Sequence, residues 1–457
     1  MSEAARRLTR ADGRPRAPVR ILHLGLGNFV RAHMCWYTEH APDAGMWGIA
    51  AFSGRTATHV EDLRGQGEVY SLLAQSRAPS LEVVSSVAGV HAADDMAAWR
   101  AYASDPAVSL ITSSITEAGY VRTGAGDLDE SLEQVRADVA ALRADSEAPV
   151  ATAPGKFVSA LVARRSAGGG PITFVPCDNV VGSGAMVRTV VTQMAALVDP
   201  TLGSWIDDNV AVISSMVDRI TPATRDADIA QVEAMAGWHD PALVVTEAFS
   251  EWVLAGEFAG PRPAWEEAGA RVVADVTPFE DRKLWLLNGA HSLMAYTGPL
   301  RGRMTVGEAI ADPVIASWVD QWWDEAGARL DMASQDVTAY RSALLDRFAN
   351  PAMKDPLSRI AADGSQKIPI RLIPTIRADL AAGRDARAGL RGVAAWVAHV
   401  RGLSTPVADA RQEEVVALGE GTWEESVAKV VSFMGLPSEV VPVVMELVEE
   451  VTGRTSR

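Results

Sequence analysis

A chain of 457 residues with a net charge of −16 is too long for one ordinary hydrophobic core and too acidic to favour nucleic acid or an anionic membrane as a partner. Its hydrophobic content of 48% and charged content of 22% are ordinary for a globular protein, and no apolar run approaches the length of a membrane span. The two cysteines, Cys35 and Cys177, are too few for a disulfide framework or a cysteine-rich zinc site, so we expect a cytoplasmic protein.

Strand and helix patterns alternate through the first 279 residues. Residues 1–20 are polar and arginine-rich, lack the apolar stretch of a signal peptide, and are predicted to form a frayed arm. Strands are predicted at 19–24, 48–52, 70–73, 81–87, 108–115, 171–175, 210–217, 243–249 and 271–276. The helices predicted between them cover 29–40, 96–103, 128–142, 156–165 and 184–197. This alternation is typical of a mainly parallel sheet with helices on both faces.

The strand signals nearly stop after about residue 279. Helical periodicity predicts helices at 283–297, 306–311, 313–325, 337–348, 372–382, 386–400, 413–418, 423–434 and 442–451. The sequence therefore predicts an α/β domain over residues 1–279, followed by an all-α domain over residues 280–457.

Gly25 and Gly27 follow the first predicted strand and precede a helix, which is where a dinucleotide pyrophosphate binds in a Rossmann-like domain. Glycines let backbone amides approach the phosphates, but Val30 occupies the usual third glycine position, and a tight turn in any α/β protein would look similar. Polar pairs also end three later strands, and ligands bind at such ends in open α/β sheets. These pairs are Thr116-Glu117, Asp178-Asn179 and Asp218-Arg219. Together they make a ligand-binding crevice the favoured interpretation.

Lys283, Asn288 and His291 occur in a predicted helix whose other residues are largely apolar. On an α-helix Asn288 and His291 are adjacent, and Lys283 lies within about 140° of both. Burial lowers the pKa of a lysine, and a lysine poised near neutrality can take a proton from an alcohol. The alternative is a lysine that reaches solvent beside a hydrogen-bonded core asparagine and histidine.

A basic pair, Arg359 and Lys367, flanks Asp363-Gly364-Ser365-Gln366, although a solvated charged loop would have the same pattern. The sequence contains neither a His-Glu-x-x-His motif nor another clear cluster of metal ligands, and it contains no Gly-x-Ser-x-Gly elbow. Neither metal-assisted nor acyl-transfer chemistry is therefore expected.

These motifs resemble, in order and over nearly the whole chain, those of the long-chain mannitol dehydrogenase family. That family also includes fructuronate reductase, altronate oxidoreductase and arabinitol dehydrogenase. The matching segments are residues 21–33 (Ile-Leu-His-Leu-Gly-Leu-Gly-Asn-Phe-Val-Arg-Ala-His), 116–120 (Thr-Glu-Ala-Gly-Tyr), 177–179 (Cys-Asp-Asn), 216–222 (Met-Val-Asp-Arg-Ile-Thr-Pro), 262–265 (Arg-Pro-Ala-Trp), 283–291 (Lys-x4-Asn-x2-His), 363–367 (Asp-Gly-Ser-Gln-Lys) and 374–376 (Pro-Thr-Ile). One departure is Ala118, where the commoner motif has glycine.

The resemblance implies zinc-independent hydride transfer between NAD(H) or NADP(H) and a polyol–ketose pair of the mannitol–fructose or arabinitol–xylulose type. It implies a Rossmann-like dinucleotide-binding domain over residues 1–279 and a substrate-binding and catalytic domain over 280–457. Lys283 would be the general acid/base, Asn179 and Asn288 would hydrogen-bond the reacting oxygen, and Glu280 would connect the lysine to solvent. The residues expected to hold substrate hydroxyls are His291, Asp218, Arg359 and Lys367. Those expected to bind the cofactor are Gly25, Gly27, Asn28, Phe29, Arg55, Thr56, Thr116 and Glu117.

Cofactor choice depends on the residues after the second strand, which are acidic in NAD-using relatives and are Arg55-Thr56 here. An arginine there suits a 2′-phosphate, so we expect NADP(H) to be accepted at least as well as NAD(H); alternatively, Arg55 points to solvent. A hexuronate reductase of the fructuronate–mannonate type is the second enzyme hypothesis. A noncatalytic dinucleotide-binding sensor is the hypothesis of another class, although it would be expected to lose Lys283 or Asn288. We expect a monomer or weak homo-oligomer.

Overall fold

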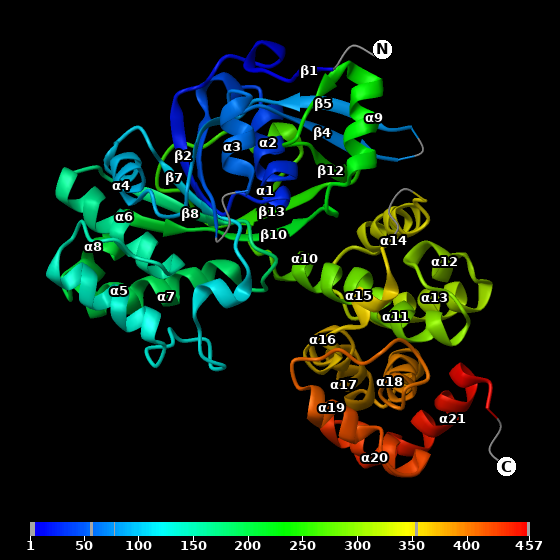
Figure 1. Ribbon diagram of the computed structural model, residues 1–457. Coiled ribbons are helices and arrows are strands. Elements are labelled where there is room, and N and C mark those ends of the chain that lie inside the picture. The colour runs from blue at the N-terminus through cyan, green and yellow to red at the C-terminus, as the bar shows by residue number, and fades with distance from the viewer. Residues whose placement is uncertain (1–4, 55–57, 77, 352–354, 455–457) are drawn as a thin grey trace. The chain divides into compact units, whose positions relative to one another are not determined.

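The computed structural model describes residues 5–54, 58–76, 78–351 and 355–454. The chain divides into two compact units, Met1–Thr277 and Pro278–Arg457 (Figure 1). The sequence expectation put the boundary between residues 279 and 280, inside helix α10 (Thr277–Arg282). The α/β and all-α characters expected for the two parts are confirmed, whereas their expected roles in binding cofactor and substrate stay predictions.

A six-stranded parallel sheet forms the centre of the N-terminal unit, with the strand order β6-β3-β2-β7-β8-β9. In chain order this is 3-2-1-4-5-6, the arrangement of doubly wound dinucleotide-binding folds. The strands are β2 (Val19–Leu24), β3 (Gly48–Phe52), β6 (Val87–His91), β7 (Leu110–Ser113), β8 (Ile172–Pro176) and β9 (Val210–Val212). Leu24 pairs in register with Phe52 on one side and with Ser113 on the other, so three strands end together.

Helices cover both faces of this sheet because side chains alternate between the faces along each strand. In β2, Leu22 and Leu24 enter one hydrophobic core, whereas Ile21 enters the other. The described helices of the unit are α1 (Asn28–Ala32), α2 (Met34–His40), α3 (Thr58–Gly65), α4 (Met96–Ser104), α5 (Glu133–Ala144), α6 (Ala153–Ala167), α7 (Ser183–Val198), α8 (Leu202–Asn209) and α9 (Asp226–Ala236). The helix predicted at 29–40 is therefore two helices, with the break at His33.

Smaller sheets flank the central one. Their strands are β1 (Arg6–Arg7) with β11 (Trp238–His239), β4 (Tyr70–Gln75) with β5 (Ser80–Val84) and β12 (Val244–Glu247), and β10 (Ser214–Asp218) with β13 (Glu251–Ala255) and β14 (Arg271–Val273). The strand predicted at 81–87 is split between β5 and β6, and that at 210–217 between β9 and β10. At the first split the Ser86 hydroxyl donates to the Cys35 carbonyl at 2.8 Å, so the chain changes sheets at a hydrogen-bonded corner.

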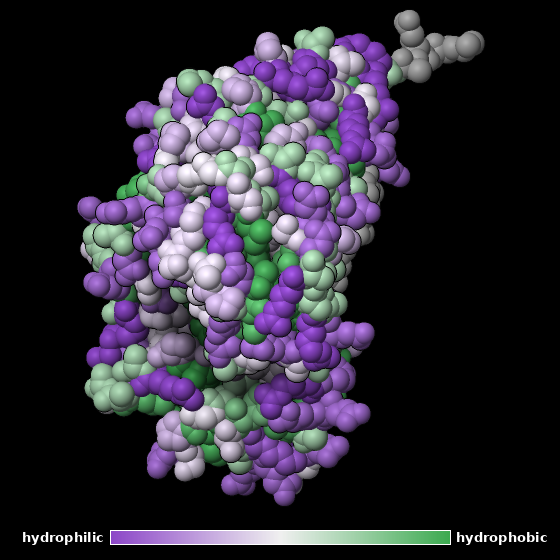
Figure 2. Space-filling model, turned by 90° about the vertical axis from the view of Figure 1, so that its left-hand side faces the viewer, coloured by the Kyte–Doolittle hydropathy of each residue, from purple (hydrophilic) through white to green (hydrophobic). Residues whose placement is uncertain are grey.

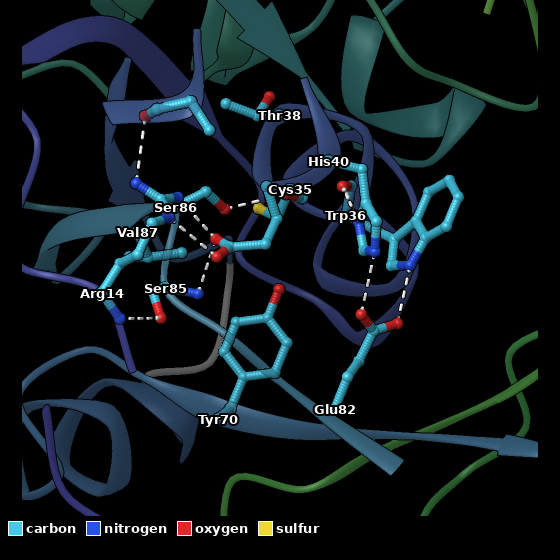
Figure 3. Close-up of polar contacts among 12 residues, drawn as sticks. Arg14, Cys35, Trp36, Thr38, His40, Tyr70, Glu82, Ser85, Ser86 and Val87 are labelled. Atoms are coloured by element: carbon cyan, nitrogen blue, oxygen red, sulfur yellow. Dashed lines mark hydrogen bonds and ion pairs between the residues drawn. The ribbon is translucent and has the colours of Figure 1, made fainter. Parts of the chain in front are cut away.

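The prediction of a frayed N-terminal arm is wrong for residues 5–20. The Arg10 guanidinium donates to the carbonyls of Gly67, Ser85 and Val87 at 2.6–2.8 Å. The Arg14 backbone N–H donates to the Ser85 hydroxyl at 2.9 Å (Figure 3). The arginines that suggested a solvated arm instead fix it to the α/β unit, because a guanidinium has donors for several carbonyls at once.

The described residues of the C-terminal unit form helices and connecting turns around α18 (Arg387–Val400). Every residue of α18 from 388 to 400 is buried, as expected for a helix surrounded by others. The other described helices are α10, the π-helix η5 (Lys283–Gly289), α11 (Ala290–Leu300), α12 (Val306–Ala311), α13 (Pro313–Gly327), α14 (Ser334–Phe348), α15 (Leu357–Ala361), α16 (Gly364–Arg371), α17 (Ile373–Ala381), α19 (Gln412–Leu418), α20 (Trp423–Phe433), the 3₁₀-helix η6 (Ser438–Val440) and α21 (Val441–Thr452). Within the described residues, no helix is both long and apolar enough to cross a membrane.

The surface in Figure 2 is largely hydrophilic, with apolar side chains in small groups between polar ones. Exposed large hydrophobic residues include Met46, Val181 and Met235, which belong to different parts of the chain. The surface is thus of the ordinary mixed kind, because some apolar exposure is normal on any folded protein.

Candidate functional site

A cavity of about 1020 Å³ lies at the carboxyl ends of β2 and β7 in the N-terminal unit. It is lined by Leu24, Gly25, Leu26, Gly27, Gly54, Ala93, Asp94, Ser114, Ile115, Thr116, Ala118, Gly119, Val121, Gln134, Val150, Ala151, Thr152, Ala153 and Lys156. This volume is large enough for a sizeable cofactor, and the position is where open α/β sheets bind ligands.

Gly25 and Gly27 contribute differently to this cavity. Gly25 has a φ of +113°, and a Cβ there would lie 2.2 Å from the Ser114 carbonyl oxygen. Only glycine fits, because no side chain tolerates both that backbone conformation and that contact. A Cβ on Gly27 would meet no atom within 4 Å, so this residue leaves open space beside the turn. The pair therefore fits a turn that a dinucleotide pyrophosphate approaches closely.

The other expected cofactor residues divide between the cavity and its surroundings. Thr116 lines the cavity. Three others are outside its lining: the Asn28 side chain accepts from Arg31 at 2.7 Å, the Phe29 ring stacks on His33 at 5.1 Å, and the Glu117 carboxylate pairs with Arg122 at 2.7 Å. Arg55 and Thr56 lie outside the described residues, although Gly54 before them lines the cavity.

A buried carboxylate joins two motifs that the sequence showed only as separate segments. Asp178 accepts hydrogen bonds from the Ile115 N–H at 2.6 Å, from the Ser113 hydroxyl at 2.9 Å and from the Tyr120 hydroxyl. Burial raises the pKa of Asp178, and these donors oppose that rise. The loop after β7, which forms one cavity wall, is thereby tied to the residue before Asn179. No local sequence pattern indicates this pairing.

Two further expected site residues belong to the N-terminal unit. Asn179 is exposed in the loop after β8. Asp218 is buried at the end of β10, paired in register with Glu251 of β13. Both stand at carboxyl ends of strands, as predicted.

The helix predicted at 283–297 begins as a π-helix, and this corrects the expected geometry of the Lys283 group. Residues Lys283–Gly289 form η5, and α11 continues from Ala290. In a π-helix hydrogen bonds join residue i to residue i+5, so Lys283 and Asn288 are about one turn apart and lie on the same side of the helix. On an α-helix their directions would differ by about 140°. Both side chains, like His291, are half-buried. Short π-helical segments occur frequently at functional sites.

Three side chains bind the backbone carbonyls of this π-helix. The Trp322 indole donates to the Trp285 carbonyl and the Trp323 indole to the Leu286 carbonyl, both at 2.9 Å. The Arg371 guanidinium donates to the Asn288 carbonyl at 3.4 Å and to the Ser292 hydroxyl at 3.1 Å. Sequence reasoning missed these residues. The signal available for the tryptophans was that a buried indole N–H needs an acceptor.

The remaining expected residues of the C-terminal unit differ in environment. Arg359 is in helix α15 rather than in a loop, and its side chain is 67% exposed and bound to Asp355 at 2.6 Å, as on an ordinary solvated surface. The Lys367 amine is half-buried, donates to the Ala362 carbonyl at 2.5 Å, and has its pKa lowered mainly by burial. The His291 ring lies 4.9 Å from that of Phe348, and Glu280 is buried in α10.

The described residues contain no group of three or more His, Cys, Asp or Glu side chains placed to hold a metal ion. Both cysteines are buried free thiols, and burial raises the pKa of each. The polar groups gathered in the two units are thus amides, carboxylates, hydroxyls and cationic side chains.

Comparison with known proteins places the chain. Family models match both units: the mannitol dehydrogenase Rossmann domain over residues 19–267 and the mannitol dehydrogenase C-terminal domain over residues 275–455. The D-mannonate oxidoreductase of Escherichia coli is 33% identical over 84% of this chain and 80% of its own length. The polyol:NADP oxidoreductase of Gluconobacter oxydans is 35% identical over the same shares, 84% and 80%. The structure of Pseudomonas fluorescens mannitol 2-dehydrogenase, in ternary complex with NAD and D-mannitol, matches with a TM-score of 0.79 and 31% identity, covering 96% of this chain and 92% of its own. The chain belongs to the mannitol dehydrogenase family of oxidoreductases.

Proposed function

We propose that this protein transfers a hydride between a nicotinamide cofactor and a polyol–ketose pair of the mannitol–fructose or arabinitol–xylulose type, without a metal ion. The observation that carries this proposal is the π-helix, because its i→i+5 repeat aligns Lys283 with Asn288. A lysine and an amide on one half-buried helix face suit the removal of a proton from an alcohol. The relatives named for polyols and mannitol support the substrate class.

In the proposed oxidation, Lys283 accepts the proton of the reacting hydroxyl as general base and returns it as general acid in the reverse direction. The side-chain amides of Asn179 and Asn288 donate hydrogen bonds to the reacting oxygen and stabilise its alkoxide character. Glu280, which precedes Lys283 by one helical turn, relays the proton toward solvent. His291, Asp218, Arg359 and Lys367 bind the other substrate hydroxyls. A bound nicotinamide supplies the hydride acceptor or donor.

The cavity at Gly25 and Gly27 supports the cofactor assignment, because its size, its place at the strand ends and the space beside Gly27 all suit a dinucleotide. We propose that NADP(H) is used at least as well as NAD(H). Similarity to a polyol:NADP oxidoreductase agrees with that choice, whereas the mannitol 2-dehydrogenase structure contains NAD.

A panel of polyols and sugar acids, assayed with each cofactor, tests the proposal. D-Mannitol, D-arabinitol and D-sorbitol should support reduction of NADP, and D-fructose or D-xylulose the reverse reaction. Lys283→Ala is the control for reduction by a contaminant. Tight dinucleotide binding without turnover on any member of the panel would instead favour the noncatalytic sensor.

A hexuronate reductase is the second candidate, and the cations of α16 favour it. Lys367 and Arg371 are half-buried, and among the described residues no carboxylate lies within 4.0 Å of either one. Two such cations suit a substrate carboxylate, which binds guanidinium in a bidentate manner. Similarity to D-mannonate oxidoreductase agrees with this candidate. Turnover of D-mannonate that clearly exceeds that of D-mannitol under the same conditions would establish it.

A further inference from the structure

Lys156 is a buried cation in the wall of the proposed dinucleotide cavity, and it lies outside the segments that match the family motifs. It occurs in the first turns of α6, is 7% exposed, and lines the cavity. Its amine donates to the Ala93 carbonyl at 2.7 Å. No carboxylate of the described residues lies within 4.0 Å of that amine.

This environment is unusual for a buried charge. Arg164, in the same helix, donates to the carbonyls of Ala103, Asp105, Gly170 and Pro171, so its charge is well solvated by the protein. The Lys156 amine has three donors and one such acceptor. Burial lowers the pKa of Lys156, and the charges of Asp138 and Asp94 only partly oppose that effect. Buried charges are normally paired, so an amine of this kind beside a cavity points to an anionic ligand.

The position of Lys156 identifies which part of a dinucleotide that anion is. Ala93, its acceptor, follows β6, and β6 pairs with β3, whose end leads to Gly54 in the same cavity. The residues after the second strand of such a sheet lie beside the adenosine ribose, whereas the glycine turn after the first strand holds the pyrophosphate. The Lys156 amine is therefore on the ribose side of the cavity.

We propose that Lys156 binds the 2′-phosphate of NADP(H) and is a determinant of cofactor selectivity. This inference rests on the proposed function and is independent of Arg55, which lies outside the described residues. Asp94 opposes the preference. It also lines the cavity, is exposed to solvent, and would repel a phosphate while accepting a hydrogen bond from a 2′-hydroxyl. The opposing effects of Lys156 and Asp94 then set the ratio of the affinities for NADP(H) and NAD(H).

The test compares two fragments that differ only in the 2′-phosphate, adenosine 2′,5′-bisphosphate and 5′-AMP, by isothermal titration calorimetry on the full chain. Lys156→Met should weaken binding of the bisphosphate about 10–100-fold, the usual effect of losing a charge-assisted hydrogen bond, and leave 5′-AMP within about threefold. Lys156→Arg should retain the discrimination, and Asp94→Asn should increase it. Lys429→Met, which removes the same charge from an exposed position in α20, is the matched control.

If Lys156→Met weakened the binding of both fragments equally, Lys156 would only support the cavity wall. A ratio of the two dissociation constants that stayed as in the unaltered protein would likewise overturn the assignment. Because Lys156→Arg preserves the charge, a folding defect of Lys156→Met does not block the test: loss of discrimination in a folded Lys156→Arg contradicts the proposal. If the unaltered protein bound neither fragment, the dinucleotide function itself would be wrong, and this inference with it.

Discussion

Gly289→Ala tests whether the π-helix packs against the Trp322 indole at Gly289. Gly289 has ordinary helical angles, φ −64° and ψ −48°. Replacing such a glycine by alanine normally stabilises a helix by about 1 kcal/mol. Here, however, the new Cβ would lie 2.7 Å from Nε1 and 2.9 Å from Cζ2 of the Trp322 indole, which is fully buried. A rigid ring must therefore move.

These contacts determine how much Gly289→Ala lowers the free energy of unfolding. Overpacking a core position costs about 1–3 kcal/mol. Displacing the indole also lengthens its 2.9 Å hydrogen bond to the Trp285 carbonyl, and losing such a bond costs about 1 kcal/mol. After subtracting the gain of about 1 kcal/mol in helix propensity, we expect Gly289→Ala to lower the free energy of unfolding by about 1–3 kcal/mol.

Chemical denaturation, followed by circular dichroism, measures this change, and Gly307→Ala is the matched control. Gly307 is also helical and in the same unit, but its Cβ would make only an ordinary contact, 3.5 Å from the Phe348 carbonyl oxygen. Gly307→Ala should be neutral or stabilising. In a Trp322→Phe background, where the two clashing atoms are gone, Gly289→Ala should cost less than in the unaltered protein. A Gly289→Ala variant as stable as the Gly307→Ala control would refute the close packing of the Trp322 indole against Gly289.

Four further outcomes are expected. Lys283→Ala should lower kcat by about 10²–10⁴-fold, the usual contribution of general acid/base catalysis, while cofactor affinity measured by fluorescence titration stays nearly unchanged; a near-normal kcat would contradict the assigned role. EDTA should not inhibit, and loss of activity together with a stoichiometric zinc would overturn metal independence. Gly25→Ala should disrupt the turn and reduce thermal stability, whereas Gly27→Ala should leave the melting temperature unchanged and weaken only cofactor binding, because its Cβ meets only open space. Burial lowers the pKa of His23 from 6.5 to about 4. Its stabilising contribution is therefore present above pH 6.5 and lost as the pH falls toward 4, so between pH 7 and pH 5 the unfolding free energy should drop by about 2 kcal/mol. His23→Gln should lack that part of the pH dependence in denaturation measured at both values.

The parts of the fold that the sequence predicted correctly are those decided by local pattern. β2 and β3 have the predicted limits because short apolar runs stop at turn-forming glycine and serine residues. α12 also matches its prediction, since Thr305 and Glu308 form a capping box that marks the start. The Lys283 stretch was found because its three polar residues interrupt an apolar segment.

The features that escaped sequence reasoning depend on partners far along the chain. The i→i+5 pairing of η5 is not distinguishable from an α-helix over seven largely apolar residues, and the tryptophans that bind it come 37 residues later. Arg10 looked solvated because its acceptors at Gly67 and Val87 are 57 and 77 residues away. No local sequence pattern marks Lys156, because only the fold encloses its side chain.

The pairing of β1 with β11 has a consequence for the order of events during synthesis. Arg6 pairs with Trp238, and Arg7 with His239, so the first described strand has no partner until the ribosome has added some 230 further residues. At about 5–20 residues per second, this interval lasts roughly 10–50 s. The six strands of the central sheet are all translated within it, since β9 ends at Val212. Arg6 and Arg7 thus gain their strand partners only after the whole central sheet has been made, whereas the acceptors of Arg10 at Gly67, Ser85 and Val87 are made much earlier. During that interval the β1 strand is accessible to chaperones and proteases in the nascent chain.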